Sequence, residues 1–435
     1  AGPLHQDATP TPVPEEESDA EAAEAESSEE APPAQLATAS ATTELSNQFG
    51  RTIVTARTNT FLVDSAPPLG HPSEEMNPVE AMLASLGTCG LFVYETAAQE
   101  LGIPMTAATF TIQGDFDASG LSGASDNNPR VQEFRAHADL EGVDDEQAAA
   151  LLEQWTLRCP IYRTLIKSAP IVVTHNDEEM GGPSAEGLAT ATVMVDLSNQ
   201  PGRSIVNVRD NYLVVDSVPP LGGPNLEVNP LDLTLAALGS CGAVIIEKAA
   251  IDNDIPLDGV ISVVEADLDP RGLADSSIDS SLQAVRVNLE IGVDNDEDAQ
   301  FLVDEWLARC PIHNTLELAT DIEVSHKLMG EGEALLDITF NYNVPVDEFQ
   351  AEISPLAEQF AATDGLIWKL WALDEANSQF SVLLLFEDAA AMQAFLDGEL
   401  AAAVTSHSAL SDFEITPFAI MGDESKITGA PQMDQ

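Results

Sequence analysis

Hydrophobic and polar positions alternate along residues 52–64 (TIVTARTNTFLVD), and this period of two predicts a pair of half-buried β-strands. A Pro-Pro turn follows at Pro67. A long helix is expected to begin at Asn77-Pro78, because Pro is favoured at the first helical position. Its apolar residues recur at helical spacing: Met82, Leu83, Leu86 and Val93.

The pattern then predicts two further strands, at residues 108–117 and 130–143. A second helix over residues 144–159 should stop at a Cys-Pro pair, since proline disfavours helical geometry in the residue before it. A last strand over residues 169–175 completes an α+β unit.

The whole pattern occurs twice. NPVEAMLASLGTCG (77–90) returns as NPLDLTLAALGSCG (229–242), and RCPIYRTL (158–165) returns as RCPIHNTL (309–316). A repeat of this length indicates a duplicated domain. We place the first copy at residues 41–176, the linker at 177–187 and the second copy at 188–328.

The chain is different at its two ends. Residues 329–422 follow a β-α-β-β-α-β order, with helices expected around 347–362 and 388–404, which is typical of a ferredoxin-like domain. Residues 423–435 have the composition of a loose tail. Residues 1–40 are acidic and of low complexity, so we expect a disordered tail that buries too little apolar surface to fold.

The formal net charge is −58, with 74 acidic against 16 basic residues. Such a surface repels nucleic acid and anionic membranes, and both are excluded as partners. Because the acidity extends far beyond the tail, we favour adaptation to high salt over a merely acidic protein. No run of the ~20 apolar residues that span a bilayer is evident. We expect a cytoplasmic protein, with export after loss of a signal peptide as the alternative.

Four cysteines form two equivalent pairs, Cys89 with Cys159 and Cys241 with Cys310. Their spacing matches no zinc site, so no metal is expected. The first cysteine of each pair follows small residues that should leave room beside the sulfur, and the second lies at the Cys-Pro turn. This arrangement suits reversible disulfide chemistry. Buried inert thiols or a fixed structural disulfide are the alternatives.

An attacking cysteine requires a lowered pKa, usually from a nearby cation. Basic residues are scarce, yet each copy keeps two strand arginines at matching positions: Arg51 and Arg57, Arg203 and Arg209. Exposed arginines paired with the acidic surface are the alternative interpretation. Glu80 and its counterpart Asp232 could orient such an arginine, or could close a helix capping box with the preceding Asn-Pro.

Taken together, these motifs resemble the OsmC/Ohr family of thiol-dependent peroxidases. The resemblance implies α+β domains that form an intramolecular pseudo-dimer with two active sites, each borrowing residues from the other half. It implies that Cys89 and Cys241 attack a hydroperoxide, that Cys159 and Cys310 resolve the sulfenic acid, and that an external dithiol, of lipoyl or other type, is the reductant. No bound cofactor is implied.

One departure concerns the glutamate that partners the arginine in the organic-hydroperoxide branch, ten residues before the first cysteine. That position holds Val79 and Leu231 here. Either Glu80 and Asp232 replace this glutamate, or the pair of glutamate and arginine is absent. The sequence therefore does not decide whether the substrate is an organic hydroperoxide or another compound.

The C-terminal domain resembles mono-oxygenases of the YdhR type, in the dimeric α/β-barrel group, which implies a possible homodimer through this domain. Trp368, Trp371 and Phe386 are expected to line or close the barrel, and His407 is the one catalytic candidate, more easily read as solvent-facing. Two other functions compete with the peroxidase. The chain could be a non-catalytic protein that binds a small ligand, or a redox or sulfur-handling enzyme that uses the same cysteines.

Overall fold

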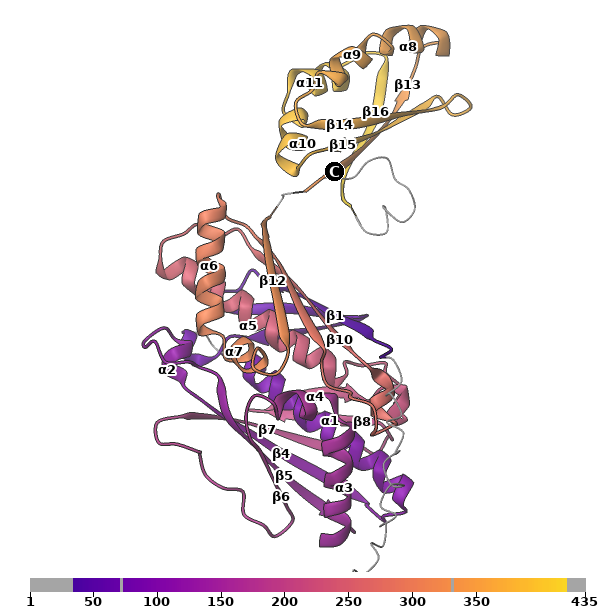
Figure 1. Cartoon of the computed structure of the whole chain (residues 1–435). Helices are drawn as coiled ribbons and strands as arrows, with labels where there is room; N and C mark the ends of the chain where they lie inside the picture. Colours follow the sequence, from indigo (N-terminus) through magenta and orange to yellow (C-terminus); the bar gives the residue numbers. More distant parts are fainter. Residues whose placement is uncertain (1–33, 71–72, 330–331, 421–435) are drawn as a thin grey trace, which may run out of the picture. The chain divides into compact units, whose positions relative to one another are not determined.

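The computed structural model of the chain describes residues 34–70, 73–329 and 332–420 (Figure 1). The expected tails, residues 1–33 and those beyond 422, lie outside the described residues. Strand β1 (Ala37–Leu45) begins within the segment expected to be disordered. Residues 37–40 were therefore wrongly assigned to the acidic tail.

Each copy contributes strands to two six-stranded sheets, and the copies exchange them. The first sheet joins three strands of the first copy to three of the second, in the order β6 (Ile171–His175), β5 (Val131–Glu141), β4 (Ala107–Phe116), β7 (Ala189–Leu197), β8 (Arg203–Val208) and β9 (Asn211–Asp216). The exchange occurs where β4 and β7 pair antiparallel, with Ile112 opposite Val193.

The second sheet is built in the same way from the remaining strands. Its order is β12 (Asp321–Leu328), β11 (Ala284–Ile291), β10 (Val260–Leu268), β1, β2 (Arg51–Ala56) and β3 (Asn59–Asp64). Here β1 of the first copy pairs antiparallel with β10 of the second. The two copies are therefore intertwined, as the predicted intramolecular pseudo-dimer requires.

Two long helices, α1 (Pro78–Leu101) and α5 (Pro230–Asp252), pack against each other and against these sheets. Both begin with the predicted Asn-Pro and a complete capping box. They are long and apolar enough to cross a membrane, but 89% and 83% of their most apolar windows is buried inside the protein. We assign them as core helices.

Glycines in α1 allow this close packing. A Cβ on Gly90 would lie 2.6 Å from the indole of Trp155, and one on Gly87 would lie 2.8 Å from Ile112. Gly87, which precedes Cys89, thus makes room for the sheet, whereas Gly90, which follows it, makes room for the indole of Trp155. This differs from the expectation that the small residues before Cys89 leave space beside the sulfur.

Shorter helices pack against the two long ones. They are α3 (Asp145–Arg158) and α4 (Pro160–Leu165) in the first copy, and α6 (Asp296–Arg309) and α7 (Pro311–Leu316) in the second. A further short helix, α2 (Ala118–Leu121), belongs to the first copy.

The C-terminal domain has its own core and the predicted ferredoxin-like order. Its antiparallel sheet has the order β14 (Leu366–Asp374), β15 (Gln379–Phe386), β13 (Ala334–Tyr342) and β16 (Leu410–Ala419). Each expected helix is split in two, giving α8 (Val346–Ile353), α9 (Leu356–Ala361), α10 (Ala389–Leu396) and α11 (Glu399–Thr405). The splits occur at Pro355 and Gly398, residues that disfavour a continuous helix.

A pair of partly buried carboxylates joins the copies. Glu247 of α5 accepts a hydrogen bond of 2.7 Å from the Gly50 amide of the other copy, and Glu95 of α1 accepts one of 2.8 Å from Gly202. Burial raises the pKa of both, that of Glu247 from 4.5 to about 7.

We predict that Glu247 makes stability pH-dependent. Because its folded-state pKa is raised, the folded protein binds more protons than the unfolded chain between pH 4.5 and about 7, so this contribution to stability is lost as pH rises through that window. Glu247→Gln should flatten the dependence of Tm on pH relative to the parent. A Tm difference between parent and variant that stays constant from pH 5 to 8 would contradict this.

We also predict that Gly90→Ala destabilises the fold. Overpacking against Trp155 should cost about 1–3 kcal/mol, more than the helix propensity of Ala returns. Urea denaturation measures the effect. Gly182→Ala, where an added Cβ meets nothing within 4 Å, is the matched control and should be near neutral.

Candidate functional site

The second cysteine of each copy lies at a junction between two helices. Helix α3 ends at Arg158, Cys159 is extended (φ −76°, ψ 117°), and Pro160 opens α4. The Cys159 Sγ accepts the amide N–H of Tyr162 at 3.3 Å, and Cys310 accepts that of His313 in the same way. As the sequence predicted, the proline ends the helix at the sulfur.

The structure brings each predicted cysteine pair together. Cys89, in the middle of α1, forms a disulfide with Cys159, with a Cα–Cα distance of 6.1 Å. In the second copy Cys241 and Cys310 are free thiols whose sulfurs are 2.6 Å apart. All four side chains are buried, none being more than 3% exposed.

Burial opposes activation of the reduced pair. Desolvation, reinforced by the neighbouring Cys310, raises the pKa of the Cys241 thiol well above its ordinary value. An attacking thiolate requires the opposite shift. In this closed arrangement Cys241 is therefore a protonated thiol.

The four candidate arginines form ion pairs with carboxylates. Over the described ranges, their hydrogen bonds and ion pairs go to carboxylates, backbone carbonyls and amide side chains, and none goes to a cysteine. The structure thus brings the cysteines to one another but leaves the arginines on other partners.

One set of arginines closes a loop within its own copy. Arg51 pairs with buried Asp64 at 2.7 Å, and Arg203 pairs with buried Asp216 at 2.6 Å. Asp64 also accepts the amides of Glu74 and Glu75. The hydrogen bonds from Arg51 and from the two amides lower the pKa of Asp64 against the opposing effect of burial. They also fix the segment that leads into α1.

The other set joins the copies. Arg57 reaches Asp232 of the second copy at 2.7 Å, and Arg209 reaches Glu80 of the first, also at 2.7 Å. Both arginines have positive φ, 56° and 48°, which non-glycine residues rarely adopt. Of the two arginines in each copy, Arg57 and Arg209 are the ones that meet the acids at the helix starts.

Glu80 fulfils both interpretations of its position. It accepts the Asn77 amide at 2.8 Å, closing the capping box, while its carboxylate also receives Arg209. Asp232 does the same with Asn229 and Arg57. Capping and arginine binding are therefore compatible, because one carboxylate has enough acceptor positions for both.

The arginine that precedes each Cys-Pro was not among the predicted site residues. Buried Arg158 donates to the Leu273 carbonyl of the other copy at 2.8 Å, and Arg309 donates to Leu121 at 3.3 Å. The threonine at the end of each motif also crosses: Thr164 accepts the Leu282 amide and Thr315 that of Val131, both at 2.9 Å. The arginine and the threonine recur at the same separation in the second copy, and this repetition could have identified them from the sequence.

The two cysteine pairs have different surroundings. In the first copy Trp155 lies against Tyr162, and Tyr94 hydrogen-bonds His175 at 2.8 Å. In the second copy Trp306 lies against His313, which is buried with Nδ1 unpaired among the described residues. Burial lowers the pKa of His313 to about 4, so this ring is neutral at neutral pH.

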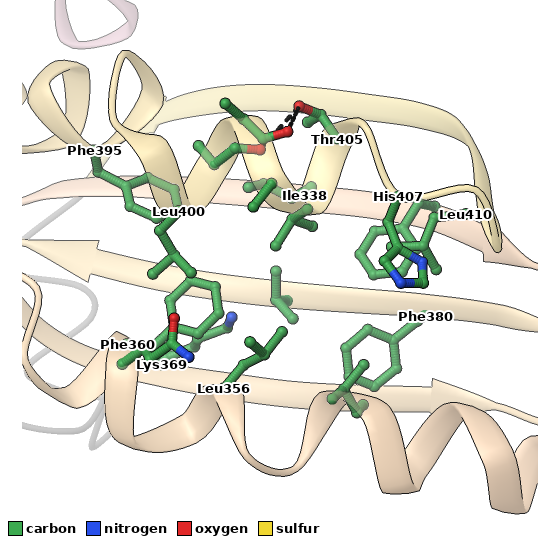
Figure 2. Close-up of a pocket in the computed structure, with 18 of the residues that line it drawn as sticks. Ile338, Leu356, Phe360, Lys369, Phe380, Phe395, Leu400, Thr405, His407 and Leu410 are labelled. Carbon is green, nitrogen blue, oxygen red and sulfur yellow. Dashed lines mark hydrogen bonds between the residues drawn. The ribbon is translucent and has the colours of Figure 1, made fainter.

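A separate cavity of about 430 Å³ lies within the C-terminal domain, between its sheet and helices (Figure 2). Trp371 and His407 line it, whereas Phe386 is buried in the domain core and Trp368 is not among the lining residues. The lining also includes Lys369, which was not among the predicted residues of this domain. Across residues 34–70, 73–329 and 332–420, no cluster of three or more His, Cys, Asp or Glu side chains could hold a metal ion.

Comparison with family models identifies the same organisation. The model "OsmC-like protein" matches residues 70–175 and 223–325, and the model "Putative mono-oxygenase ydhR" matches residues 335–431. No curated protein matches the chain.

Solved structures resemble single parts of the chain. An OsmC like protein from Mycoplasma pneumoniae is 18% identical, with 32% of this chain and 95% of that chain covered and a TM-score of 0.28. SnoaB, a cofactor-independent oxygenase from Streptomyces nogalater, is 19% identical over 20% of this chain and 93% of that chain, with a TM-score of 0.19. A protein of unknown function, NE2512 from Nitrosomonas europaea, is 23% identical over 21% and 92%, also with a TM-score of 0.19.

We predict that the pair formed by Arg209 and Glu80 couples the copies energetically. Glu80 is buried, so removing its partner leaves a poorly compensated carboxylate. A double-mutant cycle with Arg209→Met and Glu80→Gln should give about 1–3 kcal/mol, above the ~0.2–1 kcal/mol of exposed ion pairs. The exposed pair Lys327–Glu290 is the matched control. Equal coupling energies in the two cycles would contradict the prediction.

Proposed function

Because the chain carries two OsmC-like segments followed by a ydhR-type mono-oxygenase domain, we propose that it is a thiol-dependent peroxidase that reduces hydroperoxides in a stress response. The observation that supports this most directly is the meeting of Cys89 with Cys159, and of Cys241 with Cys310, across about 70 residues of sequence. In each pair one sulfur lies within reach of the other, as a cycle of thiol oxidation and disulfide formation requires.

In the proposed cycle, the thiolate of Cys89 or Cys241 attacks the terminal oxygen of a hydroperoxide. The O–O bond breaks, the alcohol leaves with one proton, and a cysteine sulfenic acid forms. The thiol of Cys159 or Cys310 then attacks that sulfur, forming the disulfide and releasing water. An external dithiol reduces the disulfide by exchange and is itself oxidised.

The buried, protonated Cys241 requires that the site opens before it reacts. The helix junction at the Cys-Pro is suited to this, because α4 and α7 are only six residues long and the sulfur is held by a single amide contact on that side. Opening would expose the thiol to water and remove the desolvation that keeps it protonated. Substrate access through this junction is part of the proposal.

Arg57 and Arg209 then have a positioning role in the proposal. Each connects a strand turn of one copy to the start of the cysteine helix in the other. In this way each site depends on both copies. A cytoplasmic location and a homodimer through the C-terminal domain are further parts of the proposal that the acidic surface and the ydhR-type domain favour.

Peroxidase activity is tested by adding cumene hydroperoxide and dihydrolipoamide to the full chain. We expect turnover in the parent, loss by at least about 100-fold when Cys89 and Cys241 are both changed to Ser, and a trapped sulfenic acid when Cys159 and Cys310 are both changed. Single-copy variants, Cys89→Ser or Cys241→Ser alone, report whether both halves turn over.

Several outcomes would contradict parts of this scheme. Absence of turnover in the parent, with all thiols intact by mass spectrometry, would refute the peroxidase and favour a binding protein with structural cysteines. Loss of activity only on changing Cys159 and Cys310 would show that the roles within each pair are reversed.

A further inference from the structure

Lys369 lies in an apolar setting that differs from that of the chain's other described lysines. Lys248 pairs with Asp252, Lys327 pairs with Glu290, and Lys167 donates to Ser281. Lys369 instead places its Nζ 2.9 Å from the centre of the Phe360 ring and 3.8 Å from that of Trp371. Among the described residues, no hydrogen bond or ion pair satisfies its amine.

The strand geometry directs this amine into the cavity. On β14, Lys369, Trp371 and Leu373 lie opposite Leu384, Val382 and Phe380 of β15, which are buried core residues. Side chains two apart on a strand share a face, so Lys369 shares the core-facing side of the sheet with Trp371. Figure 2 shows it beside Phe360 and Leu356, with His407 at the other end of the drawn pocket.

Desolvation in the cavity favours the uncharged amine, and it opposes the attraction of the Phe360 and Trp371 rings for the ammonium ion. Desolvation lowers the pKa of Lys369 from 10.5 to about 7, so a large fraction is neutral at pH 7. A neutral amine is a nucleophile, whereas the ammonium ions of surface lysines are not.

The walls of the cavity restrict what can occupy it. They are mainly aliphatic and aromatic, with few polar side chains, and the volume suits a small molecule: Ile338, Phe340, Phe349, Leu356, Phe380, Phe395 and Leu400 are among the apolar members. A net charge of −58 disfavours the approach of an anion. An uncharged, largely apolar compound with one group that reacts with an amine fits these conditions.

We propose that the cavity of the C-terminal domain is a carbonyl-binding site in which Lys369 forms a reversible imine with an apolar aldehyde. The Nζ lone pair attacks the carbonyl carbon, the C=O π electrons move to oxygen, and proton transfer gives a carbinolamine. Loss of water then forms the C=N bond. Hydrolysis reverses the step, and no oxidant or reductant takes part. This chemistry is independent of the cysteine pairs.

The test uses the full chain with octanal as the apolar probe and sodium cyanoborohydride to trap the imine as a stable secondary amine. Peptide mapping by mass spectrometry should locate the adduct on Lys369. At pH 7 we expect about a tenfold or greater preference over Lys327, which is paired with Glu290 at the surface. Octan-1-ol, which can fill the cavity but cannot form an imine, should slow the labelling, and glyceraldehyde should label Lys369 no faster than Lys327.

Matched variants separate the site from general lysine reactivity. Lys369→Arg keeps a cation but cannot form an imine, so the adduct should be lost, whereas Lys327→Arg should leave it unchanged. Lys369→Met, which suits the apolar wall, serves if the arginine variant does not fold, and it should also lose the adduct. Equal labelling of Lys327 and Lys369, an adduct that persists in Lys369→Met, or labelling unaffected by octan-1-ol would overturn the proposal.

Discussion

The structure depends on covering two open strand edges. Taken alone, strands β4–β6 of the first copy would leave the edge of β4 unpaired, and strands β10–β12 of the second copy would leave that of β10 unpaired. Unpaired edges of this kind expose a row of backbone donors and acceptors that must find partners. The chain supplies them from the other copy, through β7 and β1. Once the strands are exchanged, α1 and α5 must pack together, and the turns that carry Arg57 and Arg209 must meet the opposite helix starts.

The cysteine motif is part of this same construction. In RCPIYRTL, Arg158 and Thr164 each form a hydrogen bond with the backbone of the other copy. Cys159, which lies between them, is bonded to the long helix of its own copy. Assembly and chemistry therefore use neighbouring residues. This explains why both copies have the arginine, the Cys-Pro and the threonine of the motif, although Tyr162 of the first copy is replaced by His313 in the second.

Local patterns were enough to predict most elements. Strand alternation, the Asn-Pro helix start and the Cys-Pro stop are all encoded within a few residues, and the structure confirms them. The equivalent cysteine positions in the two copies suggested that the cysteines pair, with buried inert thiols as the alternative. Strand exchange could not be predicted from local patterns, because β4 and β7, which pair at the exchange, are separated by about 80 residues of sequence. Strand β1 was missed because Ala, Ser and Thr give it little hydrophobic contrast, and the glycine contacts and the Lys369 cavity exist only after tertiary packing.

The linker between the copies, placed at residues 177–187, has a consequence for how the protein assembles. It connects β6 to β7, which belong to one sheet but to different copies. If the two halves were separate chains, their intertwined sheets would form only by a second-order encounter and would come apart on dilution. The covalent connection replaces that encounter with an intramolecular one at high effective concentration. The assembly of the two halves is therefore independent of how much protein is present.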